Sequence, residues 1–239
     1  MKNEVDLNLL KPGNLDLSDY GTHVHFKGRY EGDRIVIDSK SASGKTLVFK
    51  DATIISTRTA PDKDAIAFRG ELKNCKIHAE NGRLIYGGLT FWNRLENVTI
   101  SGLQIFYPNA GIKASQDFPS ANVTIEHCVI VGAQREGIYF GPHHLQKVKS
   151  NNVNIRNNWI VAPGWDGIQG NALNLRIHDN LIEYAAMLQE PNQDYPITVQ
   201  AGSDAYVWNN QIITQEEEFP KGVQGLDCRI FDHPPKNNN

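Results

Sequence analysis

One short phrase recurs along most of the chain. Each copy places apolar residues at two alternate positions, then a short polar turn, and then an isoleucine. Seven copies align on that isoleucine, and they end at Ile54, Ile77, Ile105, Ile130, Ile160, Ile182 and Ile212. Neighbouring copies lie between 22 and 30 residues apart, and the residue five positions before each isoleucine is apolar. A period in the twenties predicts a solenoid built from stacked copies of one unit.

The alternation of apolar residues within each copy indicates short β-strands separated by turns. One unit of three short strands cannot bury its own apolar faces, whereas stacked units bury them in one continuous column. Neither the leucine-and-asparagine consensus of leucine-rich repeats nor the strict six-residue period of a left-handed hexapeptide helix is present. We therefore expect an all-β chain that forms a parallel β-helix of about seven coils.

The position two residues before each isoleucine carries a further signal. It reads Ala52, Cys75, Leu103, Cys128, Asn158, Asn180 and Asn210 along the seven copies. Asparagine tolerates the left-handed conformation of a tight turn. In its coil pattern and this run of asparagines, the sequence resembles the right-handed parallel β-helix proteins of the pectate-lyase-like superfamily, over about residues 33–213. The resemblance implies that the asparagine amides stack along the column, while the superfamily itself is functionally mixed.

The repeat divides the chain into three parts. Residues 1–32 precede it, and we interpret them as an N-terminal cap, because an open end of a β-helix would expose an unpaired strand edge. Residues 33–213 form the predicted β-helix. Residues 214–239 lose the pattern and end in a polar stretch, which predicts a C-terminal cap followed by a polar tail.

Composition excludes some classes of partner. The net charge is −3, from 24 basic and 27 acidic residues, so nothing in the charge favours binding to nucleic acid. No apolar run is long enough for a membrane span. The start of the chain lacks the apolar core of a signal peptide, but a mature secreted domain would look the same, and we expect an extracellular or cell-surface location. The scattered cysteines predict buried thiols, with Cys75 and Cys128 too far apart to pair.

A second recurring phrase carries the candidate chemistry. It reads "QREGIYFG" and "GWDGIQG", with Glu136 and Asp166 each directly before Gly-Ile. If the isoleucines point into the core, the residues that follow point outward, namely Lys113, Tyr139 and Gln169 on successive coils. Neighbouring coils lie about 4.8 Å apart. We therefore expect the two acids side by side on a solvent-facing groove, with these three residues along its floor.

Two neighbouring carboxylates have several uses. They can divide the roles of acid and base, their spacing is near the roughly 5–5.5 Å of a retaining glycosidase pair, and they can bind Ca²⁺. A simpler interpretation is that each acid accepts backbone N–H groups and orders its loop. The sequence leaves these alternatives open.

The surroundings of the two acids favour a carbohydrate. Arg135 and Trp165 precede the acids, and His143 follows in a Gly-Pro loop. Motifs of the polygalacturonases and of the mannuronan epimerases are absent. We expect a polysaccharide lyase or glycoside hydrolase. Apart from Ca²⁺, the residues indicate no cofactor. Its predicted catalytic residues are Glu136, Asp166, Lys113 and Arg135, and its predicted substrate-binding residues are Tyr139, Gln169, Trp165 and His143. The alternative is a non-catalytic module that binds glycan or serves as a rigid stalk of a larger surface protein.

Overall fold

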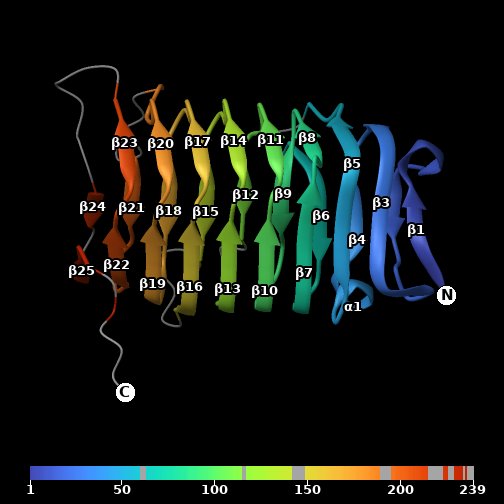
Figure 1. Cartoon of the computed structure of the whole chain (residues 1–239), viewed down its shortest axis with the longest axis horizontal. Helices are drawn as coiled ribbons and strands as arrows, with labels where there is room; N and C mark the ends of the chain where they lie inside the picture. The colour runs from blue at the N-terminus through green and yellow to red at the C-terminus, as the bar shows by residue number, and fades with distance from the viewer. Residues whose placement is uncertain are drawn as a thin grey trace.

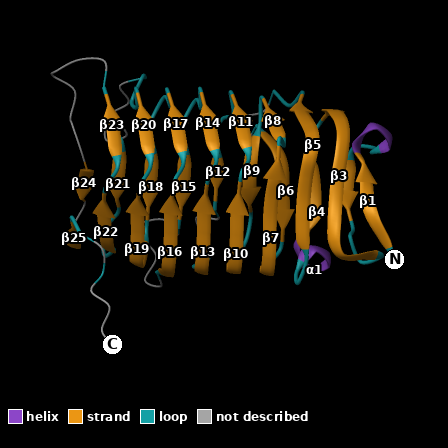
Figure 2. Cartoon of the chain, in the orientation of Figure 1, coloured by secondary structure: helices purple, strands orange, loops and turns teal. Residues whose placement is uncertain are grey.

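The chain forms a solenoid in which parallel strands stack along one long axis (Figure 1). The computed structural model describes residues 1–59, 63–114, 117–141, 149–188, 195–214, 223–225, 229–233 and 235. The N-terminus lies at one end of the column, and strands β22 to β25 lie at the other (Figure 1). Within the described residues the only helices are the 3-10 turn η1 and the short helix α1 near the N-terminal end (Figure 2).

The strands form one 16-stranded and one nine-stranded sheet. The first coils contain β1 (Lys2–Asp6), η1 (Leu7–Leu9), β2 (Gly13–Leu15), β3 (Tyr20–Gly32), β4 (Ile35–Asp38), α1 (Ser39–Ala42), β5 (Thr46–Ser56) and β6 (Asp64–Arg69). The long strand β5 pairs with both β7 and β8, and from there the larger sheet continues as two ribbons.

Each later coil contributes one strand to each of three ribbons. The first ribbon contains β7 (Leu72–Glu80), β10 (Leu95–Ser101), β13 (Ala121–Glu126), β16 (Ser150–Arg156), β19 (Ala172–His178), β22 (Asp204–Trp208) and β25 (Arg229–Phe231). The second contains β8 (Arg83–Ile85), β11 (Gln104–Phe106), β14 (Val129–Val131), β17 (Trp159–Val161), β20 (Leu181–Glu183) and β23 (Gln211–Ile213). The nine-stranded sheet starts with β2, β4 and β6 and continues with β9 (Gly88–Phe91), β12 (Ile112–Lys113), β15 (Ile138–Phe140), β18 (Ile168–Gly170), β21 (Ile197–Val199) and β24 (Val223–Gly225).

The core is a set of stacked apolar columns, as the repeat predicts. Ile105, Ile130, Ile160 and Ile182 pair in register from one coil to the next, and all four are fully buried. Toward the N-terminal end the core becomes aromatic: the rings of Phe26 and Phe49 stack with centroids 4.5 Å apart, and Phe68 stacks on Phe91 at 5.1 Å. Because every strand pairs with its copy in the next coil, these columns run through the whole solenoid.

The predicted register is wrong in the second coil. Ile54 pairs with Leu84 and not with Ile77, which instead lies in the column of Leu47 and Ile100. Cys75 therefore does not occupy the asparagine position, which belongs to Gly82 in this coil. Both Cys75 and Cys128 are buried and unpaired, as predicted.

The predicted stack of asparagines is present. Asn158 donates its side-chain amide to Oδ1 of Asn180 at 3.0 Å, and Asn180 donates to Oδ1 of Asn210 at 2.9 Å. A second ladder, which the sequence analysis missed, joins the side chains of Asn74, Asn97, Asn122, Asn152 and Asn174 from coil to coil. All five of these residues have a positive φ between 49° and 55°. Asparagine is favoured there because it adopts the left-handed conformation at lower cost than most residues.

The N-terminal segment continues the sheets. β1 pairs with β3, β3 with β5 and β2 with β4, all in parallel. Residues 1–32 therefore contribute strands of the same solenoid, with β1 and η1 at the outer end (Figure 2). The division of the chain at residues 32 and 213 stays a prediction.

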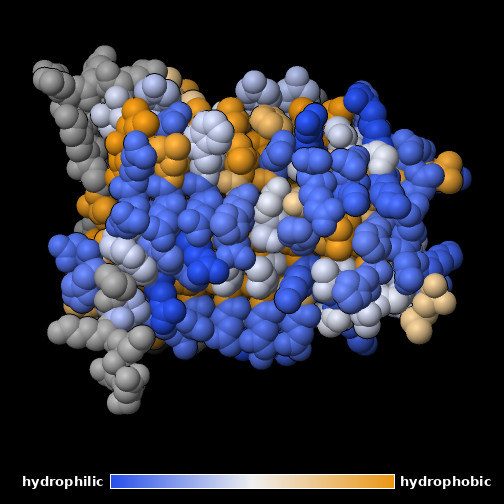
Figure 3. All heavy atoms as spheres, in the orientation of Figure 1, coloured by the Kyte–Doolittle hydropathy of each residue, from blue (hydrophilic) through white to orange (hydrophobic). Residues whose placement is uncertain are grey.

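The outward face of the second ribbon carries several apolar side chains. Phe106, Val131 and Val161 pair in one outward row and are only half-buried, and Trp159 on β17 is 45% exposed. Figure 3 shows hydrophobic atoms gathered over β14, β17, β20 and β23, above a broad hydrophilic band. No helix of the described residues is long and apolar enough to cross a membrane.

Candidate functional site

The Gly-Ile strands lie in the register that the sequence predicts. Ile112, Ile138 and Ile168 pair with one another and point into the core, so Lys113, Tyr139 and Gln169 form the adjacent outward row. The glycine of the phrase is required by close packing. A Cβ atom at Gly137 would lie 2.5 Å from Cγ2 of Ile160 and 2.7 Å from the carbonyl oxygen of Gly167. The shared phrase is therefore explained in part by the stacking of the coils.

Glu136 lies in the connection that leads into β15. Its residue is only 6% exposed, and burial raises the pKa of its carboxyl above the usual value. Its own backbone N–H lowers the pKa in part, as do the charges of Arg135 and Lys113. A carboxyl that loses water on burial holds its proton to higher pH, which favours a role as a proton donor. The position combines one acid with two nearby cations.

Asp166 occupies the same position one coil further along. It is fully buried, and its Oδ1 accepts a hydrogen bond from the backbone N–H of Tyr195 at 3.0 Å. Tyr195 precedes β21, so this contact ties the connection before β18 to the connection in the following coil. The expectation of a solvent-facing groove is wrong for this acid, because its carboxylate is used within the protein to order the backbone.

The predicted floor of an open groove is also wrong for Tyr139 and Gln169. Both are 4% exposed, and Thr198, which continues the row on β21, is fully buried. Alternation along a strand determines the direction of a side chain, but it does not determine whether other parts of the chain cover it. Within the described part of the chain, Oε1 of Gln169 and Oγ1 of Thr198 are buried without a hydrogen-bond partner.

Arg135 and Trp165 form a cation–π pair. The guanidinium carbon of Arg135 lies 4.3 Å from the centroid of the Trp165 ring. The two residues lie in adjacent coils, where the backbone N–H of Trp165 donates to the carbonyl oxygen of Arg135 at 3.3 Å. Arg135 is exposed, Trp165 is half-buried, and Lys113 is half-buried on β12. Their predicted catalytic and substrate-binding roles stay predictions, and His143 lies outside the described residues.

The structure also contains a cavity that the sequence analysis missed. It has a volume of about 490 Å³ and opens beside the exposed rings of Tyr86 and Tyr107, at the turns that lead from the second ribbon into the nine-stranded sheet. Gln134 also lines it and lies two residues before Glu136. A sequence signal exists: Tyr86, Tyr107 and Tyr184 each directly follow a strand of the second ribbon.

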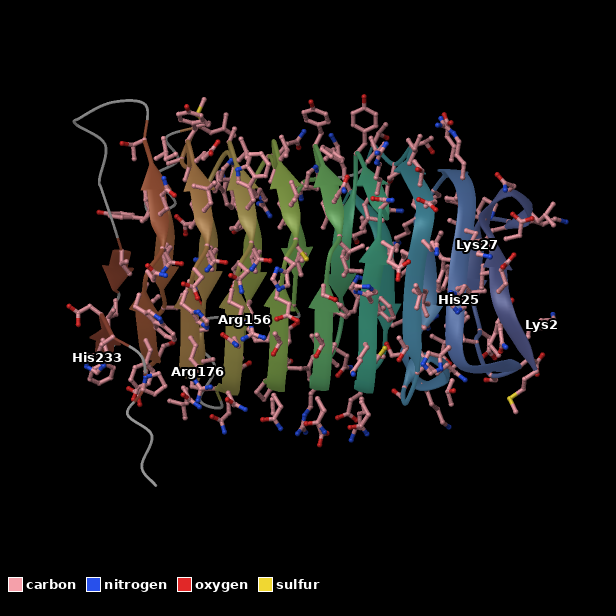
Figure 4. The ribbon with its side chains drawn as sticks, viewed as in Figure 1. Lys2, His25, Lys27, Arg156, Arg176 and His233 are labelled. Carbon is pink, nitrogen blue, oxygen red and sulfur yellow. The ribbon has the colours of Figure 1, made fainter. Side chains whose placement is uncertain are left out.

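The outward face of the first ribbon mixes basic, acidic and aromatic residues. Figure 4 shows Arg156 and Arg176 on this face, with Lys27 toward the other end. Arg156 pairs with Glu126 at 2.7 Å and Lys27 with Glu4 at 2.6 Å, so carboxylates neutralise part of the positive charge. Among the described residues, no group of three or more His, Cys, Asp or Glu side chains could hold a metal ion. Binding of Ca²⁺ by Glu136 and Asp166 stays a prediction.

The stacked parallel strands and the asparagine ladders define a parallel β-helix protein. The model of the family described as "Right handed beta helix region" matches residues 30–212, so the chain belongs to that family. This confirms the predicted resemblance and fold class. A similar solved structure is the crystal structure of the Dettilon tailspike protein (gp208), which is 12% identical in sequence with a TM-score of 0.39. The match covers 87% of this chain and 62% of the tailspike chain. No curated protein matches the sequence.

Proposed function

We propose that the chain is a carbohydrate-active β-helix protein that cleaves an acidic polysaccharide, with Glu136 as the proton-transferring residue. The observation that carries the proposal is the burial of Glu136 beside two cations on the connection into β15. Its location in the organism would be extracellular or at the cell surface, where such polysaccharides occur.

The chemistry follows from the charges around Glu136. A glycosidic bond breaks more readily when an acid protonates the leaving oxygen, and a carboxyl with a raised pKa keeps its proton to higher pH than an exposed carboxyl does. Lys113 and Arg135 lie close enough to influence the charge of Glu136. The same positive charge would attract the carboxylate of a uronate unit, and the half-buried Trp165 ring holds the Arg135 guanidinium over its face. Asp166 has a structural role in this proposal.

A panel of uronate-containing and neutral polysaccharides tests this function. Lyase cleavage is followed by the absorbance of the unsaturated product, and hydrolysis is followed by new reducing ends. We expect turnover of at least one uronate-containing polymer and a loss of about 10²–10⁴-fold in Glu136→Gln, which cannot transfer the proton. The matched control is Glu183→Gln on β20, which lies on a different sheet. Equal turnover by wild type and Glu136→Gln would contradict the assignment.

A second candidate function is a non-catalytic glycan-binding or stalk module. The burial of Asp166, Tyr139 and Gln169 favours it, as does the 6% exposure of Glu136, because buried residues are not displayed to a polymer. The same panel separates the two functions: a module binds a polysaccharide, or none, and releases no product from any of them.

A further inference from the structure

Tyr86 and Tyr107 directly follow β8 and β11, whose arrows end at one edge of the solenoid (Figure 1). Their rings form an exposed aromatic pair. Their centroids lie 6.0 Å apart at an interplanar angle of 29°. More than half of each residue is exposed, at 54% and 55%. Leaving two large rings in water has an unfavourable hydration free energy, so folding alone does not explain them.

The backbone at these two positions is also costly for tyrosine. Tyr86 has φ 59° and Tyr107 has φ 54°, in the left-handed region. The same turn position in the next two coils holds Gly132 and Ala162, which are also at positive φ. Gly132 leaves room for its neighbour, since a Cβ atom there would lie 2.8 Å from Cδ1 of Tyr107. The fold therefore imposes a positive φ at this turn position, but it does not require a tyrosine there.

Basic, hydroxyl and amide side chains line the cavity beside the two rings. Arg58 and Lys63 line it together with Thr57 and Gln134. Arg58 is oriented by an ion pair with Asp33 at 3.2 Å. None of the described residues that line the cavity is a carboxylate. Its volume of about 490 Å³ is within the range of small-ligand sites.

We infer that this cavity is a binding subsite for a sugar unit that carries a carboxylate, with the ring on Tyr86 and Tyr107 and the carboxylate near Lys63 and Arg58. Sugar rings present apolar C–H faces that pack on aromatic rings, while hydroxyls bond to threonine and amide groups. The inference rests on the proposed function, because it names the acidic class of sugar. Gln134 joins the subsite to the same connection that carries Glu136.

The test is calorimetric titration of the full chain carrying Glu136→Gln, so that binding is measured without turnover. The probes are oligogalacturonate, oligomannuronate, a glucuronate-containing oligosaccharide and sialyllactose, each beside its methyl ester, and inorganic phosphate. We expect at least one carboxylated probe to bind, its ester to bind more weakly, and added salt to weaken binding. Binding of none of these probes, or of ester and acid equally, would overturn the inference, as would equal binding of phosphate.

Variants locate the binding within the cavity. Tyr107→Leu should bind about fivefold more weakly because it loses one aromatic contact. Tyr184→Leu is the matched control, since Tyr184 has φ 55° at the same turn position but does not line the cavity. Lys63→Gln should lose affinity for the acid and leave affinity for the ester unchanged. Equal losses in Tyr107→Leu and Tyr184→Leu would overturn the inference.

Failure of the subsite and failure of the proposed function give different results. Binding that requires Tyr107, without turnover in the wild-type chain, contradicts only the proposed function. Turnover that depends on Glu136 but keeps the same KM in Tyr107→Leu contradicts only the subsite.

Discussion

Asn180 links three coils through its side chain. Its Oδ1 accepts hydrogen bonds from both the backbone and the side-chain nitrogen of Asn158, each at 3.0 Å, and its amide donates to Asn210 at 2.9 Å. The residue is 2% exposed, so water cannot replace these bonds. We expect Asn180→Ala to lower the free energy of unfolding by about 3 kcal/mol, because several buried groups lose their partners. Chemical denaturation measures the change.

The control for this ladder is Asn151→Ala. Asn151 lies on β16 and is exposed, so the substitution should change stability by no more than about 0.5 kcal/mol. A loss of less than about 1 kcal/mol in Asn180→Ala would show that the ladder does not stabilise the column.

The sequence predicted this ladder because the last five coils are regular. Five positions separate Ile100 from Ile105, and the same spacing recurs between Ile125 and Ile130. In the first two coils the equivalent distance is seven, from Leu47 to Ile54 and from Ile77 to Leu84. A two-residue difference preserves the alternation of inward and outward side chains, so periodicity alone could not detect the wrong register.

The candidate site was predictable in position but not in exposure. The outward row of Lys113, Tyr139 and Gln169 follows from strand alternation, and the structure has it in register. That Tyr139 and Gln169 are buried depends on packing around the column, which a repeat does not encode. The Tyr86 and Tyr107 pair lies in turns outside the aligned phrase, and the cavity beside it is made by several coils together.

The two buried thiols provide a second prediction. Burial raises the pKa of both Cys75 and Cys128 to about 12. The thiolate reacts with alkylating reagents, so both should be unreactive at pH 8 in the folded protein and reactive after unfolding. The measurement is mass spectrometry after iodoacetamide treatment, in a Cys228→Ser background because Cys228 lies outside the described residues.

The same thiols make stability fall at high pH. Their pKa in the folded chain is raised, so their contribution is fully present below the unfolded value of about 9 and is lost as pH rises toward about 12. The loss is about 1.4 kcal/mol per pH unit for each thiol that ionises only on unfolding. The stability difference between wild type and Cys128→Ala should shrink across this window.

Labelling of either thiol by iodoacetamide in the folded protein at pH 8 would contradict the prediction that both thiols are buried and unreactive.

The side chain of Asp166 should stabilise the folded chain. Its substitution by alanine removes the acceptor of the Tyr195 N–H and should lower the free energy of unfolding by about 1–3 kcal/mol. Thermal denaturation measures the change. Asp166→Asn keeps an acceptor oxygen and should lose less. An unchanged or increased stability of Asp166→Ala would show that the acid does not order this connection.

Substitution of Glu136 should have the opposite effect on stability at neutral pH. Its folded-state pKa is raised by burial, so protonation favours folding, and that contribution is lost as pH rises through the folded value. We expect Glu136→Gln to be more stable than wild type at neutral pH. The difference should shrink as pH falls through the raised folded-state value and should vanish below the ordinary value of 4.5, where the wild-type carboxyl is uncharged in both the folded and the unfolded chain. Denaturation curves across this range measure it.

Glu183→Gln serves as the control, because Glu183 is half-buried on the outward face of β20. It should show no such dependence on pH. Destabilisation by Glu136→Gln at neutral pH would mean that the ionised carboxylate, and not the acid, is the form that the fold favours.

The dependence of kcat/KM on pH, compared between wild type and Arg135→Gln on an acidic polysaccharide, tests whether Glu136 transfers the proton. The charge of Arg135 lowers the pKa of Glu136, so its removal should move the limb of the profile that reports Glu136 to higher pH. We expect turnover by the wild-type chain and this upward shift in the variant. Absence of turnover on every acidic polysaccharide, or a profile that stays in place when the charge of Arg135 is removed, would contradict proton transfer by Glu136.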